Sequence, residues 1–269
     1  MASIHVAASF LCLFVACTSR VSAQGQAQPD RYMQVADDFR KNALPDSAVY
    51  YYELAAREYD KMGNHEKLAN AFNQLGVVLT RQDKYGPAKK YLEKAWLIGH
   101  TALDSNSLTT AATALGLGVV YSAEEQYKQS LHFHHRALAI RLMHLGEYHA
   151  DVATSYGNLG NVYFNQKTYD KAIENHLKAL AVRDKLFGKK GVEVIQSYNN
   201  LGNAYKAKKN YQKALYYYKK ALKNKTLQLG EGHKDLVKYY QSVGDVYYLA
   251  GNKKQGDVYK AKAEMVKKG

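Results

Sequence analysis

The stretch LGEYHADVATSYGNLGNVYFNQKTYDKAIENHLKALAVRDKLFG, residues 145–188, contains one full copy of a repeat that fills most of this 269-residue chain. Its central Leu-Gly pair recurs every 42 residues, at Leu75-Gly76, Leu117-Gly118, Leu159-Gly160 and Leu201-Gly202. Weaker copies occur at Val243-Gly244 and at Val35-Ala36. A period of this length is typical of a solenoid of stacked supersecondary units, not of one closed core.

Each copy carries apolar residues at helical spacing. Tyr156, Leu159 and Tyr163 are three and four residues apart, so they share one face of a helix. Gly160 costs that helix roughly 1 kcal/mol relative to Ala. A glycine that recurs at this place in five copies indicates close packing against a second helix, which follows after the polar turn at 165–170. The sequence therefore predicts an all-α chain of helical hairpins.

The pattern of an aromatic residue, Leu-Gly, Tyr, and then two small residues seven apart resembles the tetratricopeptide repeat, in its longer kinesin-light-chain type. The resemblance covers about residues 30–267. It implies an all-α, right-handed superhelical solenoid of about six helix-turn-helix repeats. We expect these repeats at about 30–62, 68–103, 110–145, 152–187, 194–229 and 236–267.

The resemblance also implies a concave groove lined by the first helix of each hairpin. Members of the family hold peptide backbones there with Asn, whose carboxamide both donates and accepts hydrogen bonds. The groove residues that we expect are Asn73, Gln74, Val77, Val119, Asn158, Asn161, Asn199, Asn200, Asn203 and Lys206. The alternative is that these Asn residues only bridge adjacent hairpins.

The N-terminal segment predicts a signal peptide, residues 1–23. Residues 6–17 form an apolar run that is too short to span a bilayer, which takes about 20 residues. The run is followed by Val21-Ser22-Ala23, with small residues at the two places that a signal peptidase reads. We expect cleavage before Gln24 and a secreted mature chain, residues 24–269, without a transmembrane segment. An uncleaved anchor, or a cytoplasmic protein whose N-terminus only mimics a signal, are the alternatives.

Cysteine usage and one sequon bear on the same compartment. Both cysteines, Cys12 and Cys17, lie in the leader, so the mature chain would form no disulfide and no Cys-ligated zinc site. Its stability would then depend on helix packing alone. The single glycosylation sequon begins at Asn224 and falls near the end of a predicted helix.

Positive charge is concentrated in the second half of the chain. Residues 24–148 hold 14 Lys and Arg against 14 Asp and Glu, whereas residues 149–269 hold 23 against 10. Such asymmetry predicts an acidic partner, and for a secreted chain we expect an acidic matrix protein or a polyanionic glycan in place of nucleic acid. The alternative is a solvated lysine-rich face that only keeps the protein soluble. The basic patch that we assign comprises Lys208, Lys209, Lys213, Lys219, Lys220 and Lys223.

The chain lacks the motifs of common enzyme classes. It contains neither a phosphate-binding GxxxxGK[ST] loop nor a GxSxG nucleophile elbow. His65-Glu66 begins like a metalloprotease helix, but Ala69 stands where the second His would be. His132 and His135 could share a helical face, although no carboxylate or Cys lies at ligand spacing. We expect no catalytic residues, no metal site and no cofactor.

Together these features predict a secreted, non-enzymatic scaffold that binds a protein or peptide in its groove, with a basic C-terminal half for an acidic partner. One alternative is an extracellular matrix component that binds polyanions through the C-terminal lysines. Another is an intracellular cargo or adaptor protein. The salt dependence of binding distinguishes the groove-binding scaffold from the matrix component, because binding led by charge weakens more steeply with ionic strength than groove binding does.

Overall fold

The computed structural model describes residues 29–268, and the predicted signal peptide with its two cysteines lies outside these residues. Twelve α-helices and one short 3₁₀ helix make up the described part, which contains no strand. The predicted all-α solenoid of helical repeats is confirmed. The elements are α2 (Pro29–Lys41), α3 (Pro45–Lys61), α4 (His65–Arg81), α5 (Tyr85–Thr101), α6 (Leu108–Ala123), α7 (Tyr127–Leu145), α8 (Ala150–Asn165), α9 (Tyr169–Phe187), α10 (Val192–Ala207), α11 (Tyr211–Leu229), η1 (Lys234–Leu236), α12 (Val237–Leu249) and α13 (Lys253–Lys268).

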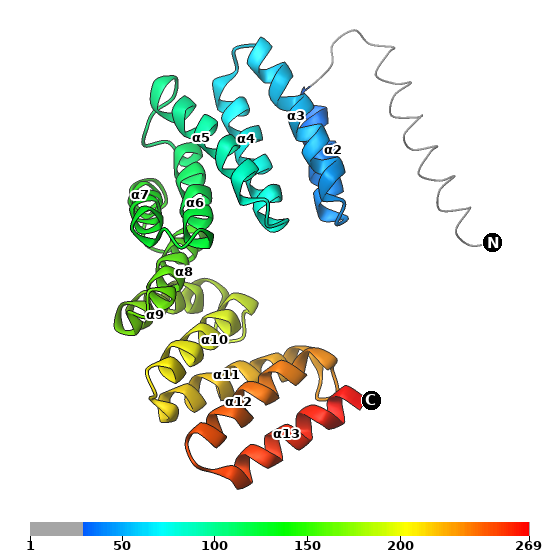
Figure 1. The fold of residues 1–269 in the computed structure, drawn as a ribbon, viewed down its shortest axis with the longest axis vertical. Coiled ribbons are helices and arrows are strands. Elements are labelled where there is room, and N and C mark those ends of the chain that lie inside the picture. Colours follow the sequence, from blue (N-terminus) through cyan, green and yellow to red (C-terminus); the bar gives the residue numbers. More distant parts are fainter. Residues whose placement is uncertain (1–28, 269) are drawn as a thin grey trace, which may run out of the picture. The chain divides into compact units, whose positions relative to one another are not determined.

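The helices form two compact units, divided after Leu103. The first unit contains α2 to α5 and the second contains α6 to α13. Within each unit every helix packs against the next one along the chain, and Figure 1 shows the paired helices of each hairpin running side by side in opposite directions. Each hairpin thus has a first helix (even number) and a second helix (odd number).

Polar side chains fix where several helices begin. The carboxamide oxygen of Asn64 accepts a hydrogen bond from the backbone N–H of Lys67, and Asn210 does the same for Lys213. His149 caps α8 through its Nδ1, which accepts from the N–H of Asp151 at 3.1 Å. These bonds satisfy donors that the first turn of a helix leaves without an intrahelical partner.

The recurring glycine of the first helix lies against one large side chain of the second helix. A methyl group added at Gly160 would stand 2.5 Å from the His176 ring, and one at Gly76 would stand 2.5 Å from Leu92. His134 covers Gly118 and Tyr218 covers Gly202 in the same way. The close helix packing expected from the repeated glycine is therefore present in the structure.

The last hairpin keeps the glycine of its first helix, Gly244, but its tightest contact is made by the second helix. There Gly256 lies against the ring of Tyr248 from the first helix, at 2.7 Å from a hypothetical methyl carbon. The Tyr248 hydroxyl donates a hydrogen bond to Asp257 beside this contact. The replacement of Ala by Gly at position 256 is thus a packing requirement, because a methyl group there would overlap the Tyr248 ring.

Buried arginines link consecutive hairpins in the second unit. Arg141 on α7 donates to the Ser155 hydroxyl on α8 at 2.9 Å, and 42 residues later Arg183 on α9 donates to Ser197 on α10 at 2.7 Å. Burial lowers the pKa of both guanidinium groups. The α7–α8 and α9–α10 interfaces thus share the same polar contact.

Two of the large side chains that cover glycines are histidines, and burial lowers their pKa. His134 is 1% exposed and His176 is 2% exposed. Loss of hydration lowers the pKa of each to about 4, with smaller contributions from His135 and Arg141 near His134 and from Arg183 near His176. Both rings are therefore neutral in the folded protein at neutral pH.

We predict that Gly160→Ala destabilises the protein, whereas Gly244→Ala does not. Overpacking typically costs about 1–3 kcal/mol, and Ala gains roughly 1 kcal/mol in helix propensity. Because the overlap with the His176 ring is severe, we expect a net loss of up to about 2 kcal/mol at position 160. At Gly244 the nearest atoms lie 3.3–3.5 Å from a hypothetical methyl carbon, and the propensity gain should prevail. Urea denaturation followed by circular dichroism measures both effects, and equal losses would contradict this account.

We also predict that the two buried histidines make the fold sensitive to acid. The unfolded chain takes up protons at these residues below its ordinary pKa of about 6.5, while the folded rings stay neutral until about pH 4. Stability from the neutral rings is thus complete above pH 6.5 and is lost as the pH falls toward 4.

The matched variant is His134→Leu with His176→Leu, because Leu92 fills the same place on α5. Its Tm should fall less between pH 6.5 and 4.5 than that of the wild type. Carboxylate contributions are common to both proteins and cancel in the comparison, so an identical loss of Tm would refute the assignment to these rings.

Candidate binding surfaces

The first helices of the second unit form the inner side of its bend. Helices α6, α8 and α10 approach one another more closely than the second helices of the same hairpins do. Their side chains that point away from the second helices therefore line the concave surface of this unit. Because this unit contains most of the predicted groove residues, it is the part of the chain in which a groove can be assessed.

Carboxamides occupy the centre of this inner surface. Asn161 on α8 and Asn203 on α10 are exposed and hold the same place in successive repeats. Asn158 and Asn200, three residues earlier on each helix, are half-buried, as is Asn199. Residues three apart are neighbours on a helix surface, so each helix presents a pair of carboxamides. The structure thus places the predicted Asn residues of repeats four and five on neighbouring first helices.

The two exposed carboxamides differ in their remaining hydrogen-bonding capacity. The Oδ1 of Asn203 accepts a hydrogen bond from the Tyr218 hydroxyl. Burial raises the pKa of that hydroxyl well above its usual value, so it remains a donor. Asn203 therefore offers a ligand mainly its two N–H donors, whereas the exposed Asn161 side chain can both donate and accept.

Apolar and charged side chains flank the carboxamides. Val119 on α6 occupies the same repeat position as Asn161 and is half-buried. Lys206, also half-buried, holds its ammonium group 6.0 Å from the centre of the Tyr218 ring. The inner surface thus changes from apolar on α6 to polar on α8 and α10, with one cation near the end of α10.

The predicted groove residues of the first unit are placed differently. Gln74 and Val77 on α4 are half-buried, but Asn73 is only 5% exposed. The assignment of Asn73 to an open groove is corrected by this burial. Ala69, Asn73 and Gly76 are four and three residues apart, and all three lie on the packed face of α4. The residue type suggested a groove position, while the helical phase places it inside.

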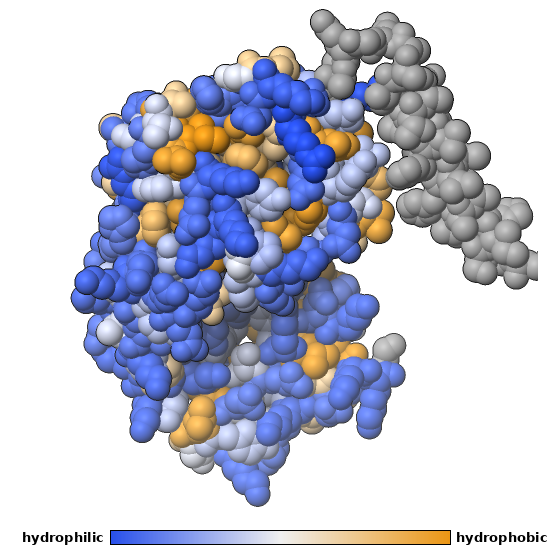
Figure 2. Space-filling model, turned by 45° about the horizontal axis from the view of Figure 1, so that its top comes forward, coloured by the Kyte–Doolittle hydropathy of each residue, from blue (hydrophilic) through white to orange (hydrophobic). Residues whose placement is uncertain are grey.

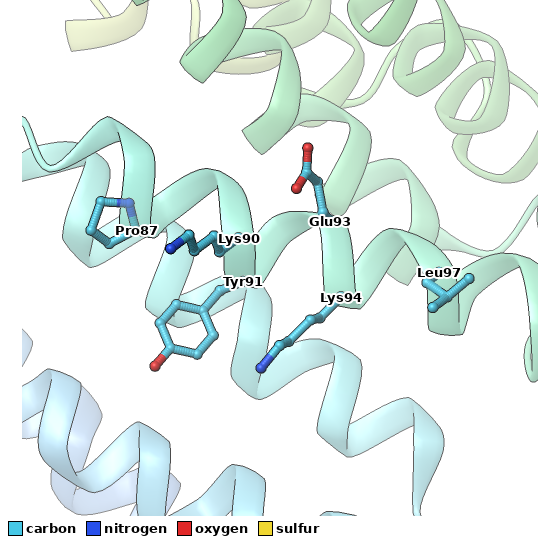
Figure 3. A pocket seen from close by; sticks show the side chains of 6 residues that line it. All are labelled: Pro87, Lys90, Tyr91, Glu93, Lys94 and Leu97. Atoms are coloured by element: carbon cyan, nitrogen blue, oxygen red, sulfur yellow. The ribbon is translucent and has the colours of Figure 1, made fainter.

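An open hollow of about 540 Å³ lies along α5 in the first unit and was not anticipated from the sequence. It is lined by Pro87, Lys90, Tyr91, Glu93, Lys94 and Leu97. In Figure 3 Tyr91 and Lys94 point to one side of the helix and Glu93 points to the other. Tyr91 donates to Glu53 at 2.6 Å, and burial together with this bond raises its pKa to about 12. The Tyr91 hydroxyl of this lining is thus already engaged within the unit.

The predicted basic patch lies on α11 and the turn that precedes it. Lys208 forms an ion pair with Asp170, while Lys209 and Lys223 are exposed. Lys213, Lys219 and Lys220 each lie over a tyrosine ring. The surface view in Figure 2 is largely hydrophilic, with hydrophobic residues in separate small patches. All six lysines of the patch are exposed except Lys220, which is half-buried, and several have defined positions.

The sequon nitrogen at Asn224 is engaged. The Nδ2 of Asn224 donates to the backbone oxygen of Lys189, and Gln228 donates to that of Lys190 at 3.0 Å. These two bonds hold the loop between α9 and α10 against the end of α11. A glycan attached to Nδ2 would have to break the first of them.

Two further features bear on the chemistry available to the described residues. They include no group of three or more His, Cys, Asp or Glu side chains that could hold a metal ion. Nor does any of their helices have the length and apolar character needed to cross a membrane. His134, one of the three neighbouring histidines on α7, packs against Gly118.

Comparison with known proteins places this arrangement in a family. Models of the tetratricopeptide repeat match residues 68–107 and three overlapping segments, 109–185, 151–226 and 193–255. No curated protein sequence matches significantly.

Several solved structures share the fold. BtubC (BKLC) from P. vanneervenii is 19% identical with a TM-score of 0.66, and the match covers 89% of each chain. A putative kinesin light chain with nearly identical TPR-like repeats from Podospora anserina is 17% identical with a TM-score of 0.68, over 76% of this chain and 96% of that one. The apo form of RapI is 18% identical with a TM-score of 0.63, and the match covers 89% of this chain and 97% of that one. Since the family models span 109–255 without a gap, more than half of its length, this chain belongs to the tetratricopeptide-repeat family.

Proposed function

We propose that this protein is a secreted, non-enzymatic scaffold that holds an extended peptide across the inner surface of its second unit. The observation that carries the proposal is the pair of exposed carboxamides, Asn161 and Asn203, at equivalent places on adjacent helices. Tetratricopeptide arrays are typically protein-interaction scaffolds, and a concave surface built from first helices is the usual place for a ligand.

The chemistry of this surface favours recognition of a peptide backbone. Carboxamides pair with backbone N–H and C=O groups, which every peptide has, so affinity would depend little on the ligand's side chains. Selectivity would come from the flanks. Val119 suits an apolar side chain, and Lys206 suits an acidic one.

The second element of the proposal is the compartment. The apolar run at 6–17 and the small residues before Gln24 support secretion, and the lysine-rich second half supports an acidic partner outside the cell. Two other functions share part of this support. One is a matrix component that uses only its lysines, and the other is an intracellular adaptor that uses only its groove.

We predict that Asn158→Ala with Asn161→Ala weakens peptide binding. Ligands would be selected from a random peptide library on the wild-type protein, and their affinities measured by calorimetry. Loss of two net hydrogen bonds of about 1 kcal/mol each should raise Kd by about thirtyfold.

The matched control is Gln129→Ala with Gln212→Ala, which removes two exposed carboxamides from the second helices α7 and α11. This control should bind the selected peptides as the wild type does. Equal affinity of both double variants and the wild type would reject the groove.

We further predict that a secreting host releases the protein with Gln24 as its first residue. The intact mass of C-terminally tagged protein, measured separately in medium and cells, tests this. Full-length protein in the cytosol would remove the argument for secretion and favour the intracellular adaptor.

A further inference from the structure

The outward face of α11 gathers four lysines around one exposed tyrosine. Tyr216 is 53% exposed. Its neighbours along the helix surface are Lys213, three residues before it, and Lys219, Lys220 and Lys223, three, four and seven residues after it. We call these five residues the Tyr216 cluster. With a rise of about 1.5 Å per residue, it extends along roughly 15 Å of helix.

The charge of the Tyr216 cluster is not balanced by acids. Helix α11 contains no Asp or Glu. Among the described residues, none of the four cluster lysines forms an ion pair with a carboxylate, whereas Lys178 and Lys208 elsewhere in the second unit do. The cluster thus presents four uncompensated ammonium groups to solvent.

Tyrosine rings hold three of these four ammonium groups in place. The Nζ of Lys220 lies 4.4 Å from the centre of the Tyr216 ring, and that of Lys213 lies 5.2 Å from the centre of Tyr205. The Nζ of Lys219 donates to the Tyr247 hydroxyl at 2.5 Å and lies 4.9 Å from its ring centre. Cation–π contacts of this kind restrain long side chains. A ligand that binds here therefore has less side-chain entropy to overcome.

The corresponding face of α9 is an internal comparison. Forty-two residues earlier, Glu174 stands in place of Tyr216, Leu177 in place of Lys219 and Ala181 in place of Lys223. Glu174 pairs with Lys178 at 2.7 Å, which neutralises the equivalent of Lys220. Lys171 stands in place of Lys213, so this face of α9 keeps one net positive charge where that of α11 has four. The same repeat therefore folds with a much less basic outer face, and its hairpin does not require lysines at the places of Lys219 and Lys223.

The basic surface continues beyond α11. The loop that Asn224 and Gln228 hold against the end of this helix carries Lys189 and Lys190, both exposed. The sequon lies beside the Tyr216 cluster. Its Asn224 nitrogen, to which a glycan would be attached, is engaged in the hydrogen bond to the Lys189 backbone oxygen. The two hydrogen bonds from α11 thus keep Lys189 and Lys190 next to the lysines of the Tyr216 cluster.

We propose that the Tyr216 cluster is a binding site for a sulfated polysaccharide. Sulfate groups spaced along a flexible chain can meet lysines on a convex helix one after another, without a pocket, and short lysine-rich runs such as 219–225 are typical of heparin-binding patches. The exposed Tyr216 ring gives a sugar ring an apolar surface to lie against. A bilayer would need several apolar side chains on this face, where only Leu227 follows the cluster. This site rests on the secretion proposed above, but it is separate from the inner surface of the unit and does not depend on the peptide groove.

The test replaces the Tyr216 cluster by its α9 counterpart. Tyr216→Glu, Lys219→Leu and Lys223→Ala together reproduce residues that the same repeat already accommodates. Heparin is the probe, with Kd measured at 0.15 M NaCl in the full mature chain. We expect the triple variant to bind on the order of tenfold more weakly and to leave a heparin column at lower salt. The double variant Lys219→Gln with Lys223→Gln keeps Tyr216 and should show part of this loss of heparin affinity. It replaces the triple variant in the test if the triple variant does not fold.

The control removes the same net charge elsewhere. Lys254→Ala, Lys267→Ala and Lys268→Ala change exposed lysines of α13 and should leave most of the affinity intact. The groove variant Asn158→Ala with Asn161→Ala should bind heparin as the wild type does. Equal weakening by the α13 control would show that net charge, not the Tyr216 cluster, governs binding. Polyglutamate or phosphatidylserine vesicles that bind as tightly as heparin, with the same loss in the triple variant, would reject a sulfated polysaccharide as the ligand.

Discussion

The contact between a glycine on one helix and a large side chain on its partner is the constraint on which the rest of this structure depends. Gly160 under His176 and Gly202 under Tyr218 bring two helices so close that a single methyl group would overlap the ring. In the last hairpin, where Gly244 is loosely covered, the tight contact is made by Gly256 on the second helix and Tyr248 on the first. What is required is one small and one large residue at each crossing, whichever helix provides them.

This contact explains the order within each hairpin, and the second unit adds a polar link between hairpins. Arg141 and Arg183 each reach the serine hydroxyl of the following first helix. A buried guanidinium bonded mainly to neutral oxygens contributes little net stability, but misplacing it by one turn would leave a charge unpaired. The link therefore penalises alternative registers between hairpins, which a surface of Ala and Leu alone would tolerate.

The fold could be predicted from the sequence because the contacts that build it recur. Most copies repeat the glycine, the aromatic residues and the small residues in the same phase, so six weak signals combine into one. Asn73 shows the limit of this reasoning, since its residue type suggested a groove and its helical phase buries it. The lysines show another limit. Their number was evident, but their placement over Tyr205, Tyr216 and Tyr247 depends on side chains that come from three different helices.

The two surfaces of the second unit are under unequal constraint. On the inner side Asn203 is tied to Tyr218, so a change that suits a ligand also disturbs the packing below it. On the outer side Glu174 and Tyr216 occupy equivalent places, and the hairpins stack in the same way beneath both. Outward positions can therefore acquire charge without cost to the repeat, while inner positions must satisfy the fold and the ligand together. A solenoid of this kind gains a new partner most easily on the outer faces of its second helices, where α11 differs most in charge from α9.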